Sequence, residues 1–174
     1  MDVLTKSGDT RVDVESLFVA RYERVARLIG RVIRNPGRAE ELAVEVFLKY
    51  SRIVLPVGGG AEGWLYRTAT RIAVDELRTQ ARRSRYEPLL RLAGRLATPE
   101  ELHNATEEQG RVRVVLGVIA PRQAELPVLR SEGVSYEELA VALELNPASV
   151  GTLLSRAQQA FRKEYVKRYG TENY

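Results

Sequence analysis

Two short helical patterns meet across a short break between Ser135 and Tyr165. Ser135 can cap the first pattern while Glu138 reaches back to its amide, an arrangement known as a capping box. Asn146 and Pro147 can start the second pattern as its cap and first residue, because proline has no amide hydrogen to leave unsatisfied there. Apolar residues recur at helical spacing in both patterns. The layout predicts a helix-turn-helix, although any helical hairpin with a polar turn gives a similar pattern.

Helical periodicity continues through almost all of the chain, and alternating strand patterns are missing, so we expect an all-α protein. A length of 174 residues fits two small helical domains joined by a linker, the second being the helix-turn-helix domain. The first domain is expected over residues 14–83 as three helices, with breaks at residues 35–37 and 55–60.

A linker is expected over residues 84–97, where Pro88 and Gly94 interrupt the pattern and a short helix remains an option. The second domain is expected over residues 98–168 and opens with the capping box of residues 98–101. Pro127 lies inside a helix that Pro121 starts, and the sequence gives no reason for it.

Composition excludes several classes of function. The chain has no cysteine and a single histidine, so no metal site is expected, and nothing indicates a cofactor. No nucleophile–base pair or paired carboxylate set can be located, so we expect no catalytic residues and no enzyme. The polar N-terminus and the lack of an apolar run near 20 residues predict a cytoplasmic protein without membrane insertion. A net charge of +4 suits a polyanionic partner, but an ordinary helical domain can also carry it.

Three stretches, residues 38–53, 61–83 and 126–163, together resemble regions 2 and 4 of the extracytoplasmic-function (ECF) group of bacterial RNA polymerase sigma factors in the sigma-70 family. The resemblance covers residues 14–83 and 112–163, and the order and spacing of the motifs agree. It implies a promoter-specificity subunit that binds the β′ clamp and β flap of core polymerase and catalyses nothing itself. The first domain would melt the −10 element and the second would read the −35 element of promoter DNA, and an anti-sigma factor is a further partner left open.

Core binding is implied for Glu41, Val44 and Glu45, which share one face of the second expected helix. The family usually has glutamine where this chain has Val44, so one hydrogen bond of the interface is in doubt, although an apolar contact could replace it. The carboxylates could instead form an ordinary solvated helix face.

Recognition of the −10 element is implied for the third expected helix. Its candidate DNA-binding residues are Tyr66, Arg67, Arg71, Arg78, Arg82 and Arg83, since arginines can follow phosphates and a tyrosine can stack on a base. Trp64 is better explained as a core residue. The family often has Asn at the position of Arg71, so the −10 sequence itself cannot be inferred. The preceding glycine-rich loop would hold a flipped base or be an ordinary connection.

The recognition helix departs most from the family, which usually carries cations where this chain has Gly151 and Leu153. The remaining candidate −35 contacts are Asn146, Ser149, Thr152, Ser155 and Arg156. The alternative function is a sigma-like regulator that binds an anti-sigma factor or polymerase without reading promoters.

Overall fold

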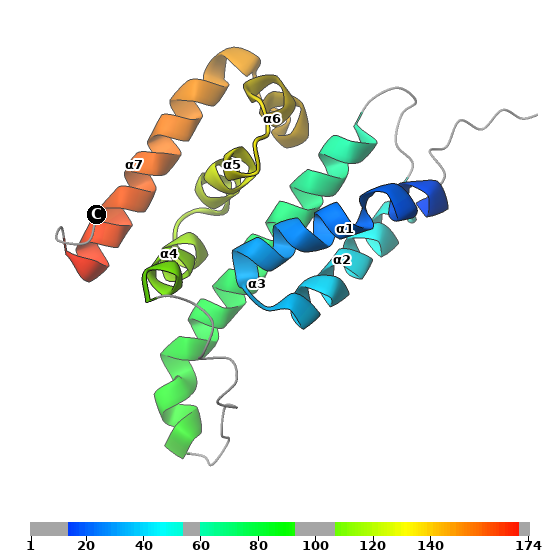
Figure 1. Cartoon of the computed structure of the whole chain (residues 1–174). Helices are drawn as coiled ribbons and strands as arrows, with labels where there is room; N and C mark the ends of the chain where they lie inside the picture. The colour runs from blue at the N-terminus through cyan, green and yellow to red at the C-terminus, as the bar shows by residue number, and fades with distance from the viewer. Residues whose placement is uncertain (1–13, 54–59, 93–106, 171–174) are drawn as a thin grey trace, which may run out of the picture.

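The computed structural model describes residues 14–53, 60–92 and 107–170, and all regular structure in these ranges is helical (Figure 1). The first part of the chain forms α1 (Val14–Ile33), α2 (Pro36–Tyr50) and α3 (Ala61–Leu92). The second part forms α4 (Glu107–Val118), α5 (Pro121–Ser131), α6 (Tyr136–Leu143), the 3-10 turn η2 (Pro147–Ser149) and α7 (Val150–Tyr169). The predicted all-α fold, with a helix-turn-helix in the second part, is confirmed.

Local capping chemistry sets where the helix-turn-helix begins. The Ser135 hydroxyl accepts a hydrogen bond from the Glu138 amide at 3.2 Å, and the Glu138 carboxylate accepts one from the Ser135 amide at 2.8 Å. The capping box at the start of α6 is therefore formed. The Asn146 side chain accepts a hydrogen bond from the Ala148 amide at 3.0 Å, but it caps the 3-10 turn η2. Consequently α7 begins at Val150 instead of at Pro147.

Helix α3 is longer than the sequence predicts. It continues past residue 83 to Leu92, so most of the segment expected as a linker over residues 84–97 is helical. The capping box expected at residues 98–101 lies outside the described residues, and the described part of α4 begins at Glu107. Pro127 lies inside α5, as the sequence predicts, and nothing in the structure explains its presence there.

Helix α3 contributes to the packing of both halves of the molecule. Figure 1 shows α1 and α2 on one side of it and α4 and α5 on the other. Leu65 and Ala69 of α3 are fully buried in an apolar core that also includes Leu129 of α5 and Leu139 of α6. A second cluster joins the fully buried Val74 of α3 to residues of α4, α5 and α7. Burying one such large side chain stabilises the fold by about 1.5–3 kcal/mol. Both halves of the molecule therefore gain stability from their shared contacts with α3.

A glycine allows the close crossing of α3 and α4. A Cβ atom added at Gly117 of α4 would lie 2.9 Å from the carbonyl oxygen of Leu77 in α3. Backbone cannot move aside as a flexible side chain can, so any larger residue at this position would push the two helices apart.

Candidate nucleic-acid interface

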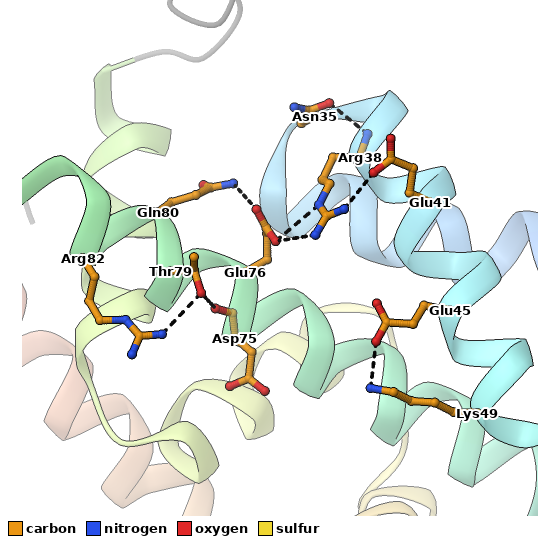
Figure 2. Close-up of polar contacts among 10 residues, drawn as sticks. All are labelled: Asn35, Arg38, Glu41, Glu45, Lys49, Asp75, Glu76, Thr79, Gln80 and Arg82. Atoms are coloured by element: carbon orange, nitrogen blue, oxygen red, sulfur yellow. Dashed lines mark hydrogen bonds and ion pairs between the residues drawn. The ribbon is translucent and has the colours of Figure 1, made fainter. Parts of the chain in front are cut away.

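The acidic face of α2 is positioned by the cap at its start. Asn35 accepts a hydrogen bond from the Arg38 amide at 3.0 Å, and Pro36 occupies the first turn. Glu41 then pairs with Arg38 at 2.7 Å, and Glu45 pairs with Lys49 at 2.9 Å (Figure 2). The two carboxylate side chains stay 68% and 48% exposed. Exposed pairs of this kind contribute about 0.2–1 kcal/mol, so a partner can take over either carboxylate.

Arg38 also connects this face to α3. Its guanidinium donates to Glu76 of α3 at 3.2 Å as well as to Glu41 (Figure 2). The hydrogen bond to Glu41, followed by that to Glu76, raises the pKa of Arg38. Glu76 also accepts from Gln80 of the same helix at 3.3 Å, so Arg38 joins α2 to a small polar cluster on α3.

Val44 lies beside an apolar hollow of about 400 Å³ between α1 and α2. Phe18, Phe47 and Leu48 line the same hollow. The Phe18 and Phe47 rings meet edge to face with centroids 5.0 Å apart, and Leu48 is 52% exposed. Phe18 was not among the residues that the sequence suggested for this surface. The outward spacing of Val44 and Leu48, one helical turn apart, was the signal for an exposed apolar contact.

Tyr66, a candidate base-stacking residue, is held by the first domain. Its hydroxyl donates to Glu62 at 2.9 Å, and the Arg24 guanidinium lies 5.1 Å from the ring centroid. Burial, followed by the hydrogen bond to Glu62, raises the pKa of Tyr66 to about 12. Glu62 also pairs with Arg21 at 3.3 Å. One face of the ring is thus already covered by an arginine from α1, which the sequence did not indicate.

Arg67 and Arg71 are both paired with carboxylates of the second domain. Arg67 forms an ion pair with Glu144, which follows α6, and its own side chain is only 18% exposed. Arg71 donates to Glu125 of α5 at 3.5 Å and remains 57% exposed. Two arginines that the sequence assigns to DNA therefore face acidic groups of the same chain.

The other three candidate arginines of α3 differ in exposure. Arg78 donates to the carbonyl oxygen of Ile119 at 3.0 Å, a contact with the connection between α4 and α5. Arg82 and Arg83 are exposed, and Arg82 donates within its own helix to Thr79 at 3.4 Å (Figure 2). The first three arginines, Arg67, Arg71 and Arg78, lie at helical spacing on one side of α3, and we call them the arginine face.

Glu125 is an unusual carboxylate because its side chain is only 3% exposed. Burial raises its pKa, and the nearby Arg71 opposes that shift. Its Oε2 atom has no hydrogen-bond partner among the described residues, and neither has the buried Thr70 hydroxyl. The contact between α3 and α5 therefore contains an unsatisfied carboxylate oxygen, which destabilises it relative to an apolar contact.

The helix-turn-helix presents a polar outer surface on α7. Thr152, Ser155 and Arg156 are exposed, whereas Ser149 is half-buried. Asn146 is exposed, but its side-chain oxygen is engaged in capping η2. Leu153 is half-buried and packs against the core, so its side chain adds little to the exposed surface on which DNA contacts are expected.

No group of three or more potential metal ligands is found among the described residues. Within the same ranges no helix is sufficiently long and apolar to span a membrane. Most of the glycine-rich loop, residues 54–59, lies outside the described residues, so the structure does not address its expected role.

Known proteins similar to this chain are sigma factors, although no family model matches it. The chain is 30% identical over 175 residues to ECF RNA polymerase sigma factor SigK of Mycobacterium sp. (strain JLS), covering 93% of this chain and 87% of that protein. It is 31% identical over 180 residues to SigK of Mycolicibacterium vanbaalenii, covering 94% and 88%. Identity to ECF RNA polymerase sigma factor SigE of Mycolicibacterium smegmatis is 28% over 164 residues, covering 91% of this chain and 63% of that protein.

The described part of the chain is helical and contains a helix-turn-helix, and the similar proteins are named as sigma factors. These findings define its class as the RNA polymerase sigma factors. Within that class the chain belongs to the ECF RNA polymerase sigma factors. A comparison with solved structures matches the chain to one chain in the co-crystal structure of the sigma factor RpoE with the anti-sigma factor NepR from Bartonella quintana. That match has a TM-score of 0.49 and 18% identity, and it covers 89% of this chain and 97% of that one.

Proposed function

We propose that this chain directs promoter-specific initiation by binding core polymerase through α2 and promoter DNA through α3 and α7. The β′ clamp would contact Glu41, Val44 and Glu45, and the β flap would contact the second domain. The observation that carries the proposal is the alignment of Arg67, Arg71 and Arg78 on one side of α3, in a chain of this family. Guanidinium groups one and two helical turns apart on one side of a helix suit the phosphates of a DNA strand. Such a protein works in the cytoplasm, where polymerase and promoter DNA meet.

Charge complementarity supports the polymerase contact. Glu41 and Glu45 make only exposed pairs within α2, and a basic partner can replace Arg38 and Lys49 without disturbing the core. The hollow beside Val44 adds an apolar contact at the same surface. An apolar side chain of the clamp would fit there in place of a hydrogen bond to glutamine.

Run-off transcription tests the proposal. The protein is combined with core polymerase and a template that carries the promoter upstream of its own operon. Initiation that depends on both protein and core is expected. Specific polymerase binding without initiation at that promoter, or at promoters from a selected library, would favour the regulator that does not read promoters. The departures at Gly151 and Leu153 are the observation behind that second function.

A further inference from the structure

A hollow with a basic lining lies where α1 ends and α2 begins. It has a volume of about 490 Å³, and its lining includes Arg27, Arg31 and Arg34. Arg27 and Arg31 lie one turn apart on α1, and Arg34 follows directly after the helix. Of the described residues that line the hollow, Glu40 alone is acidic. We call this site the basic hollow, and its volume is typical of sites for small ligands.

Arg34 holds an unfavourable backbone conformation beside the basic hollow. Its φ angle is 58°, in the left-handed region, where glycine is the usual residue at the end of a helix. Its amide donates a hydrogen bond to the carbonyl oxygen of Gly30 at 2.8 Å, which closes the last turn of α1. A glycine would make the same hydrogen bond without the steric cost of a Cβ atom. The turn itself therefore does not require an arginine, and residues held in such conformations concentrate at functional sites.

A fourth arginine approaches this region from α4. Figure 1 shows the end of α1 pointing towards α4. Arg113 of α4 is half-buried, and no carboxylate pairs with it among the described residues. Burial lowers the pKa of Arg113, and the positive charge of Arg34 lowers it further. Two like charges from different helices thus lie near each other, an arrangement that an anion beside them would stabilise.

The carboxylates beside the other two arginines are compatible with an anionic ligand. Arg31 pairs with Glu132 at 2.8 Å, and Arg27 reaches Glu23 only at 4.0 Å. The two arginine side chains stay 59% and 63% exposed, and exposed pairs of this kind are weak, so an anion can share or replace these partners. A basic residue at the end of a helix also interacts favourably with the helix dipole. That effect accounts for Arg31, but it does not account for Arg113, which belongs to a different helix.

We propose that the basic hollow binds a small oligophosphate, such as inorganic pyrophosphate or the phosphate chain of a free nucleotide, with Arg34 and Arg113 as its main contacts. A guanidinium can donate two parallel hydrogen bonds to phosphoryl oxygens. Arginines spread over two helical turns suit linked phosphoryl groups better than a single phosphate. The site is separate from promoter recognition, because none of the four arginines is among the candidate DNA contacts.

Calorimetric titration of the full chain with inorganic pyrophosphate tests the proposal. The titration is made without divalent cations and is repeated with phosphate and with sulfate at the same ionic strength. Saturable binding at one site is expected, tighter for pyrophosphate than for the other two anions. Pyrophosphate at ten times its Kd should raise the melting temperature by about 3–6 °C. A parallel titration with adenosine triphosphate distinguishes the two sources, since tighter binding than pyrophosphate would identify a nucleotide and equal or weaker binding a free oligophosphate.

Two variants separate a ligand site from a structural role. Arg34→Gly and Arg113→Gln should each weaken pyrophosphate binding by about tenfold or more. Both should leave the chain without ligand at least as stable as the parent, because the first relieves backbone strain and the second removes a half-buried charge. Arginines retained only for the fold would instead lower the melting temperature when replaced. Arg52→Gln is the matched control, since Arg52 is an exposed arginine just beyond the other end of α2.

Several results would overturn the proposal. Equal affinity for sulfate and pyrophosphate would indicate an adventitious ion only. The parent's Kd in folded Arg34→Gly and Arg113→Gln would place the phosphates elsewhere, and an equal loss in Arg52→Gln would show that binding follows net charge. If one of the two variants loses helicity, the other decides alone. Binding of a single-stranded oligodeoxynucleotide that is weakened by these variants, without binding of pyrophosphate, would assign the basic hollow to nucleic acid instead.

Discussion

The acidic face of α2 and the arginine face of α3 are both charged surfaces at helical spacing, but their charges are neutralised differently. Glu41 and Glu45 pair with cations of their own helix, three and four positions away. Arg67 and Arg71 pair with residues 77 and 54 positions away in the other domain. A partner that takes over Glu41 or Glu45 would displace only exposed pairs within α2, whereas one that takes over Arg67 and Arg71 would displace carboxylates from the second half of the chain. The comparison teaches that the ion pairs of the first surface are ready for exchange, whereas those of the second are conditional on the packing of the two halves.

The largest expected effect comes from reversing the charge of the ready surface. Glu41→Lys with Glu45→Lys should weaken association with core polymerase by several kcal/mol, because like charges then face the basic partner. The fold should survive, since both side chains are exposed. Co-purification with core measures the effect. Glu23→Lys on α1, which also removes an exposed pair four positions apart, is the matched control. Full core binding by the double variant would show that α2 is not the docking surface.

Removing three arginines tests whether exposure decides which cations reach DNA. Arg78→Ala, Arg82→Ala and Arg83→Ala together should lower the salt dependence of DNA binding by about 0.7–0.9 per lost phosphate contact, with little change in sequence preference. Affinity titrations over a range of salt concentrations measure this slope. In the free chain Arg82 and Arg83 should contribute most, because Arg78 also bonds to Ile119. A slope that equals the parent's would make these arginines an ordinary solvated surface.

The outer face of α7 is a second ready surface, and it should carry sequence preference. Ser149→Ala and Arg156→Ala should change the preferred −35 sequence, with each good base contact contributing about 1–3 kcal/mol. Asn146 needs a different substitution, because Asn146→Ala also removes the cap of η2 at a cost of about 1 kcal/mol. Asn146→Asp keeps the capping oxygen and changes only the groups offered to a base. Binding-site selection that returns the parent's −35 sequence for all these variants would argue against α7 as the reader.

Protonation of Glu125 and of Glu144 should change the stability of the chain in opposite directions. The pKa of Glu125 is raised by burial, despite Arg71 and Arg122 and with a small contribution from Asp75. The folded chain therefore binds the Glu125 proton more tightly than the unfolded chain does. Below the ordinary glutamate pKa the residue is neutral in both states and costs no stability. As pH rises from there through the raised pKa, ionisation of Glu125 lowers the free energy of unfolding. Glu125→Gln should stabilise the chain by roughly 1–2 kcal/mol at neutral pH and by less in acid.

Glu144 should show the reverse dependence. Its pKa is lowered by the hydrogen bond from Arg67, so its contribution is present above the ordinary glutamate pKa and is lost as pH falls through the lowered value. Urea unfolding of the parent, Glu125→Gln and Glu144→Gln at several pH values measures both. The same pH trend in the two variants would contradict the described environments.

The smallest effect is expected from adding one charge to the outer face of α7. Gly151→Lys should raise DNA affinity for all sequences by up to about 1 kcal/mol through one exposed phosphate contact. A Cβ atom fits there, 3.6 Å from the Tyr136 ring. Gly151→Gln gives a similar gain in helix propensity without charge and is the control. Equal affinity of the two variants would place this turn of α7 away from DNA. Leu153→Arg is not a useful companion, because Leu153 packs on the core.

Features that depend on neighbouring residues could be predicted from the sequence, and those that depend on packing could not. The capping box at Ser135 and the cap at Asn35 follow from side chains within three positions of the amides they bind. The length of α3 was underestimated, because Pro88 suggested a break that the helix passes through. The covering of Arg67 and Arg71 depends on long-range packing, which periodicity does not report.

One signal for the covered surface was present in the sequence and was missed. Glu125 stands among the apolar residues of α5, between Ala124 and Leu126, which are both buried. A carboxylate among inward-facing residues indicates either a buried partner or an opposing cation. Charged residues near Tyr66 were a similar signal. Arg24 and Glu62 contact its ring and hydroxyl, and Arg21 pairs with Glu62, so the tyrosine is already engaged within the chain.

The burial of Val74 has a consequence for how the chain unfolds. Its side chain is 0% exposed in a cluster that includes residues of α4, α5 and α7, so separating the two halves would expose apolar surface to water. Loss of either half should therefore destabilise the other, and the two halves should melt in one cooperative transition.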